Sequence, residues 1–150
     1  MFRFVIACLL LLAGPVMAQF RVEVTGVGMT QMPIAVAPLR GEAASPQKLS
    51  AIVQADLERS GQFKGIDTAN AAIDELSRPD WSVWRQRSAD ALVGGSINRL
   101  ADGRYDIRAR LWDVVKGQDK AEFRDTVPAA DLRQAAHRLA DWVYQQLTGT

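Results

Sequence analysis

A chain of 150 residues, with 48% hydrophobic and 23% charged residues, can bury the core of one domain and carry short appendages. Its 18 basic and 17 acidic residues nearly cancel, so the chain has no overall field of one sign that would favour binding to nucleic acid or to an acidic membrane surface.

Residues 1–18 have the pattern of a secretory signal peptide. Arg3 precedes an apolar run, residues 4–12, and small residues precede Ala18. The run is shorter than the roughly 20 residues of a membrane-spanning helix. An alternative is a lipoprotein processing site at Cys8, which the apolar residues after this cysteine disfavour. Cleavage after Ala18 would leave a mature chain without cysteine, and so without disulfides, thiol chemistry or cysteine-metal sites.

Residues 19–28, QFRVEVTGVG, alternate apolar with polar side chains and end in two glycines. The pattern predicts a strand-forming segment on a flexible tether. It is either an edge strand of the domain or a mobile arm that adds itself to the sheet of a partner.

The next elements alternate between strand and helix. Residues 33–39, PIAVAPL, predict a buried strand, and residues 41–45 predict a loop. Ser45 is the expected N-cap of a helix, with Pro46 in its first turn, and Gly61 is expected to end that helix. Its apolar positions recur every three to four residues, at Leu49, Ile52, Val53 and Leu57.

Residues 62–66 predict a short strand, and residues 67–79 show no clear period and predict a loop with at most one helical turn. Asp80 is the expected cap of a brief helix that places Trp81 and Trp84 on one face.

A β-hairpin is the strongest pattern in the chain. Residues 92–100 and 105–111 read as its two strands, and Asp102 and Gly103 supply the tight turn. Residues 120–127 alternate as a third strand, which predicts an antiparallel meander. The pair Gly94-Gly95 predicts a bulge or a close backbone approach rather than a phosphate site, because no helix start follows it.

A long amphipathic helix ends the chain. One apolar stripe runs along residues 129–147, and Gly149 is placed to end the helix. The stripe consists of Leu132, Ala136, Leu139, Val143 and Leu147.

No residue pattern indicates catalysis, a metal or a cofactor. His137 is the only histidine, and Arg133 and Asp141 lie one helical turn from it, which favours a solvated or interface residue. Asp56 and Asp141 read as members of ion pairs on helix surfaces. The segment Gly26-Val27-Gly28 lacks the third glycine of a dinucleotide motif. The tryptophans read as core and rim packing: Trp81, Trp84, Trp112 and Trp142.

Three stretches, in this order and spacing, resemble the N-terminal domain of the TolB proteins of the Tol-Pal envelope system. They are residues 52–63 (IVQADLERSGQF), residues 90–113 (ADALVGGSIN, then DGRYDIRARLWD) and residues 135–149 (AAHRLADWVYQQLTG). The segment QFRVEVTGVG followed by PIAVAP matches the start of mature TolB proteins, so the resemblance covers residues 19–149.

The resemblance implies an α/β fold in which a mixed β-sheet with an antiparallel meander packs against two main helices. It implies a signal peptide over residues 1–18, a partner-binding arm over residues 19–30 and the folded domain over residues 31–150. In TolB proteins the arm binds the C-terminal domain of TolA in the periplasm, which links the inner membrane to the outer membrane and peptidoglycan during cell division. By position, the TolA-binding residues are Gln19, Phe20, Arg21, Val22, Glu23, Val24, Thr25, Gly26, Val27 and Gly28.

Ordinary members of the family continue into a six-bladed β-propeller, which binds the lipoprotein Pal, and this sequence shows no blade-like repeat. The expected function is therefore protein interaction without enzymatic activity or cofactor, with Pal as a partner only if a propeller follows. The alternative is a stand-alone periplasmic scaffold or regulatory domain that acts on a cell-wall enzyme.

Overall fold

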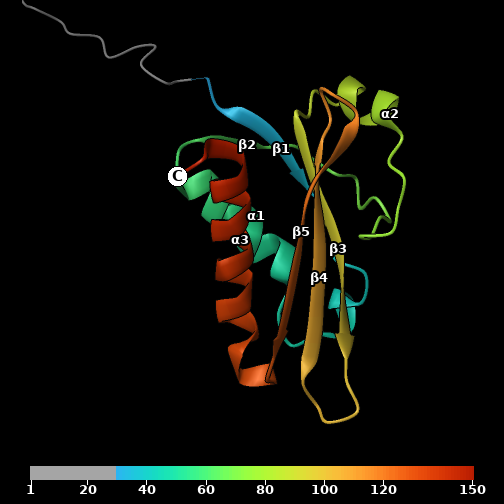
Figure 1. The fold of residues 1–150 in the computed structure, drawn as a ribbon, viewed down its shortest axis with the longest axis vertical. Helices are drawn as coiled ribbons and strands as arrows, with labels where there is room; N and C mark the ends of the chain where they lie inside the picture. The colour runs from blue at the N-terminus through green and yellow to red at the C-terminus, as the bar shows by residue number, and fades with distance from the viewer. Residues whose placement is uncertain (1–29) are drawn as a thin grey trace, which may run out of the picture.

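The computed structural model describes residues 30–150, which form a five-stranded mixed sheet with the strand order β2-β1-β3-β4-β5 (Figure 1). β1 (Met32–Val36) lies between β2 (Phe63–Gly65) and β3 (Ala91–Arg99) and runs parallel to both. β3, β4 (Tyr105–Asp113) and β5 (Gln118–Val127) form an antiparallel meander. The predicted α/β class, mixed sheet and meander are confirmed.

Two helices cover one face of the sheet (Figure 1). α1 (Leu49–Arg59) and α3 (Leu132–Thr148) pack against each other and against the strands. A 3-10 turn, η2 (Ala129–Asp131), precedes α3, and Gly149 ends the helix in a left-handed conformation, as predicted. The buried members of the predicted α3 stripe are Leu132, Ala136, Leu139 and Val143, and Leu147 packs on them half-buried.

The opposite face has its own smaller core. α2 (Trp81–Gln86) and the segment before it cover buried side chains of the sheet, including Leu92 and Trp112. The Asp80 carboxylate accepts a hydrogen bond from the Ser82 backbone N–H at 3.1 Å, which confirms the predicted cap. Trp84 and Trp112 are buried, and Trp81 and Trp142 are half-buried, as expected for core and rim residues.

The predicted start of α1 is wrong. Ser45 does not cap the helix: α1 begins at Leu49, four residues later, and the Ser45 hydroxyl accepts a hydrogen bond from the Gln47 N–H at 3.3 Å instead. Instead Glu42, which lies in the 3-10 turn η1 (Glu42–Ala44) and is 6% exposed, accepts hydrogen bonds from the N–H and the hydroxyl of Ser50. A buried carboxylate from eight residues upstream thus accepts one of the free N–H groups at the helix N-terminus.

The glycine pair of β3 is a place of close backbone approach. A Cβ on Gly95 would lie 2.0 Å from the Arg108 carbonyl oxygen of β4, whereas a Cβ on Gly94 would meet only side chains, the nearest being Ile73 at 3.0 Å. The β3–β4 register is continuous across both residues, so the alternative expectation of a bulge there is wrong. The register shift of the sheet falls between Leu111 and Trp112, where β4 pairs with β5.

We expect Gly95→Ala to lower the free energy of unfolding by about 2 to 3 kcal/mol, because backbone atoms of β4 would have to move. Gly94→Ala is the matched control and should cost less, since the side chain of Ile73 can shift. Urea unfolding of the two variants measures the difference, and equal losses would show that the strands approach less closely than described.

Candidate functional site

The ten predicted partner-binding residues, Gln19 to Gly28, lie outside the described residues, so the structure shows only how they are attached. Gln31 donates its side-chain amide to the Gly61 carbonyl at 3.3 Å, and the Met32 N–H donates to the Gln62 carbonyl at 2.9 Å. From Met32 the chain enters β1, which has a partner strand on each side. The arm is therefore joined to the core through an interior strand.

His137 lies between the two main helices rather than in a cleft. Its ring Nδ1 contacts the Asp56 carboxylate of α1, and the imidazole is 42% exposed. Asp56 also pairs with Arg59 at 2.7 Å, which confirms the predicted helix-surface ion pair, whereas Asp141 has no ion pair within residues 30–150. Across residues 30–150, no group of three or more His, Cys, Asp or Glu side chains is placed to hold a metal ion. The His137–Asp56 contact therefore links α1 to α3.

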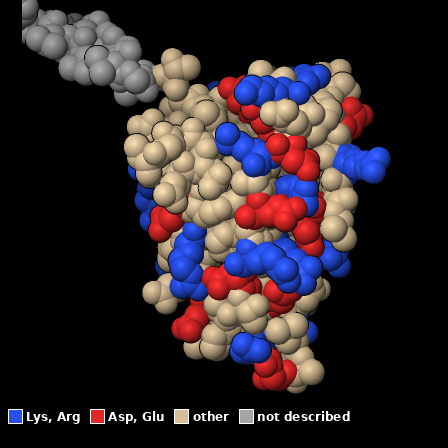
Figure 2. Space-filling model, viewed as in Figure 1, with Lys and Arg blue, Asp and Glu red and all other residues tan. Residues whose placement is uncertain are grey.

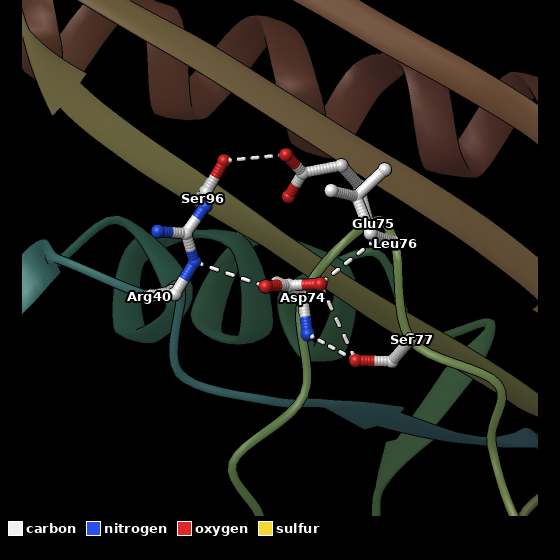
Figure 3. A network of polar contacts seen from close by, with 6 residues as sticks. All are labelled: Arg40, Asp74, Glu75, Leu76, Ser77 and Ser96. Atoms are coloured by element: carbon white, nitrogen blue, oxygen red, sulfur yellow. Dashed lines mark hydrogen bonds and ion pairs between the residues drawn. The ribbon is translucent and has the colours of Figure 1, made fainter.

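The segment predicted as a loop, residues 67–79, is held by a polar network (Figure 3). One carboxylate oxygen of Asp74 accepts from the Leu76 N–H at 2.8 Å and from the Ser77 hydroxyl at 3.3 Å. The other oxygen accepts from the Arg40 guanidinium at 2.9 Å. The Leu76 N–H first, and then the charge of Arg40, hold the pKa of Asp74 below its usual value against the opposing effect of burial.

The neighbouring Glu75 ties the same segment to the centre of the sheet (Figure 3). Its Oε1 accepts a hydrogen bond at 2.8 Å from the hydroxyl of Ser96, a fully buried residue of β3. Sequence reasoning missed this network, because the segment has no hydrophobic period. The sequence feature that could have predicted the network is Asp74-Glu75-Leu76-Ser77, because short polar side chains can bond to nearby backbone N–H groups.

Two open hollows flank this network. The first, of about 380 Å³, is lined by polar and apolar side chains that include Glu75, Trp81 and Arg110. The second, of about 350 Å³, lies between residues 38–40 and residues 70–74 and is mainly apolar. Arg110 is held by ion pairs with Asp119 and Glu122 of β5. The first hollow thus has a charged wall in which the terminal nitrogens of Arg110 are paired, whereas Glu75 Oε2 and Arg110 Nε have no hydrogen-bond partner among the described residues.

The charge on the surface is mixed. Figure 2 shows acidic and basic side chains interleaved on the face it presents, without an extended area of one sign. This agrees with the formal net charge of +1 and gives no electrostatic footprint for nucleic acid on that face. Within residues 30–150, none of the helices has the length and apolarity needed to cross a membrane.

Comparison with known proteins gives consistent matches along the chain. Residues 20–120 match the family model described as the TolB amino-terminal domain. The Tol-Pal system protein TolB of Albidiferax ferrireducens is 64% identical over 135 residues, covering 90% of this chain and 32% of the relative. The protein of the same name from a Polaromonas species is 59% identical over 142 residues, covering 93% of this chain and 33% of the relative.

A solved structure supports the same fold. TolB from Acinetobacter baumannii superposes with a TM-score of 0.67 and 33% identity, covering 79% of this chain and 29% of that chain. The chain therefore spans about a third of the length of the curated relatives it matches.

We expect Asp74→Asn to lower the free energy of unfolding at pH 7 by roughly 1 kcal/mol, the scale for a partly solvated, hydrogen-bonded carboxylate. Because the folded-state pKa of Asp74 is depressed, its contribution is present above the unfolded-state pKa of about 4 and is lost as the pH falls through the folded-state pKa. The difference in free energy of unfolding between the native chain and the variant should therefore shrink below about pH 4.

Urea unfolding at a series of pH values measures this gap. Asp141→Asn, on the exposed face of α3, is the matched control and should leave the unfolding curve unchanged at every pH. A gap for Asp74→Asn that stayed constant into acid would show that the charge of Asp74 does not stabilise the segment.

Proposed function

This chain belongs to the TolB amino-terminal domain family, and we propose that it acts as a periplasmic protein-interaction component of the Tol-Pal system. The observation that carries the proposal is the match to Tol-Pal system proteins over 90% of the chain at 64% identity. Its task is to connect inner-membrane TolA with the outer membrane and peptidoglycan machinery during cell division. The activity rests on contact rather than on catalysis.

The proposed contact is made by the arm, Gln19 to Gly28, which adds a strand to the TolA C-terminal domain. The side chains of Phe20, Val22 and Val24 supply the apolar face of this strand, and the backbone supplies ladder hydrogen bonds. Ordering the ten residues costs roughly 1 to 2 kcal/mol each in backbone entropy, which consumes much of the gain. We therefore expect binding in roughly the micromolar range, as suits a reversible link.

The attachment of the arm supports this role. Gln31 and Met32 are hydrogen-bonded to residues 61 and 62, so the segment that follows the arm is fixed to the core where β1 begins. Force on the arm would be carried by β1 and its two parallel neighbours rather than by a peripheral loop.

Pal enters the proposal only through a propeller that would follow this domain. In Figure 1 the end of α3 and the start of β1 lie at the same end of the sheet. A domain joined after α3 would thus lie close to the base of the arm, where its occupancy by Pal could influence access to TolA.

The test is a calorimetric titration of the TolA C-terminal domain into the chain beginning at Gln19 and into a chain beginning at Gln31. We expect micromolar binding by the first chain and none by the second, with the same thermal melt for both. Equal binding by both would move the site onto the folded domain. Recovery of a cell-wall synthase without TolA from periplasmic extract would instead favour the regulatory alternative.

Val22→Asp should abolish TolA binding while leaving the melt unchanged, because it buries a charge in the proposed strand contact. Val115→Asp is the matched control, since Val115 is 64% exposed on the folded domain, and it should bind like the native chain. A lower melting temperature for Val22→Asp would show that the arm is a strand of the domain itself.

A further inference from the structure

The sheet has one long edge. β5 pairs with β4 on its inner side, and no strand within residues 30–150 pairs with its outer side. The Leu100 N–H donates a hydrogen bond to the Arg104 carbonyl, so these two residues form a hydrogen-bonded pair. Hydrogen-bonded and non-hydrogen-bonded pairs alternate from this pair through the meander. It follows that residues 120, 122, 124 and 126 direct their N–H and C=O groups to the open edge. An edge of this length is a template for another strand.

Arg124 is a charge on this edge without a counter-charge among the described residues. Arg124 lies directly opposite Arg108 of β4, and like charges at opposed positions disfavour each other. Arg108 is held by Asp106 at 2.9 Å, whereas Arg124 has no ion pair within residues 30–150. An acidic side chain on an added strand, placed opposite Arg124, would supply the missing partner.

An aromatic pair lies on the other face of the same strand. Phe123 of β5 packs against Trp142 of α3 with ring centroids 5.5 Å apart, and both residues are only partly buried. Their remaining exposed surface is apolar area that an added strand with an apolar residue at this level would cover.

We propose that the strand that fits this edge is β5 of a second copy of the chain, paired antiparallel about a two-fold axis at Phe123. In this register Glu122 of each copy lies opposite Arg124 of the other, and Phe123 lies opposite its own counterpart. The two five-stranded sheets become one continuous sheet. A two-fold contact repeats each favourable pair, so both Arg124 side chains gain a carboxylate.

The neighbouring registers are less favourable. A shift by two residues in one direction sets Glu122 against Glu122, and the opposite shift sets Arg124 against Arg124. A slip by one residue would place charged side chains on the face that carries Phe123. Charged residues on an edge strand commonly prevent it from pairing with another strand. On β5, the order of the charged residues instead allows two copies of the strand to pair in one register. The contact area of one strand edge is small, so the dimer should be weak.

Sedimentation velocity of the mature chain from about 10 µM to about 1 mM tests the proposal, a range chosen for weak association. We expect a reversible dimer for the native chain. Arg124→Glu and Glu122→Arg should each weaken dimerisation at least about tenfold, because each sets like charges opposite across the axis twice. The double exchange Glu122→Arg with Arg124→Glu should restore it.

Arg133→Glu, on the exposed surface of α3, is the matched control for the charge change and should dimerise like the native chain. Thermal melts separate dissociation from unfolding, since Glu122 also pairs with Arg110 within one copy. Val22→Asp should leave the dimer intact, because the contact does not involve the arm. A native chain that stays monomeric, a dimer unaffected by both single exchanges, or a double exchange that does not restore dimerisation would each overturn the proposal.

Discussion

The burial of β3 on both faces is the constraint on which the rest of the structure depends. This strand pairs parallel with β1 and antiparallel with β4, so it is the point where the sheet changes direction. Its first seven residues, including the polar Ser96, are buried, one side under α1 and α3 and the other under α2 and the segment before it. Two cores of different size are thereby built on one strand. At Gly95 this strand also approaches the backbone of β4 too closely for a side chain to fit.

The two faces are closed by different kinds of interaction. On the larger face, apolar side chains from two amphipathic helices fill the space above the sheet, and the His137–Asp56 contact joins the helices at their surface. On the smaller face, buried tryptophans contribute packing, but the preceding segment is positioned by carboxylates. Asp74 and Glu75 bond to Arg40 and Ser96, which lie just after β1 and within β3. Hydrogen bonds to ionised groups are strong and directional, so a few of them can order a segment that buries little apolar surface.

Two features of the domain underlie the contacts proposed for it. β1, the strand that follows the arm, lies inside the sheet between two neighbours, and the long edge strand β5 carries charges of both signs. Family membership connects the chain to the Tol-Pal system. In the contacts proposed for the arm and for the open strand edge, backbone hydrogen bonds would recruit the partner and side chains would select among registers. Such contacts are reversible because ordering costs offset most of the interaction energy.

The sequence by itself determined the elements that depend on local periodicity. The alternation in residues 105–111 and 120–127, the Asp102-Gly103 turn, the apolar stripe of α3 and the Asp80 cap all involve residues close together in the chain. The family resemblance, carried by three stretches in order, added the mixed sheet. Only the tertiary structure decided that Glu42 rather than Ser45 supports the start of α1, that residues 67–79 are tied to β3, and that the register shift lies at Leu111. Each of these depends on partners that folding brings together from separate segments, and the spacing of residues along one segment carries no record of such partners.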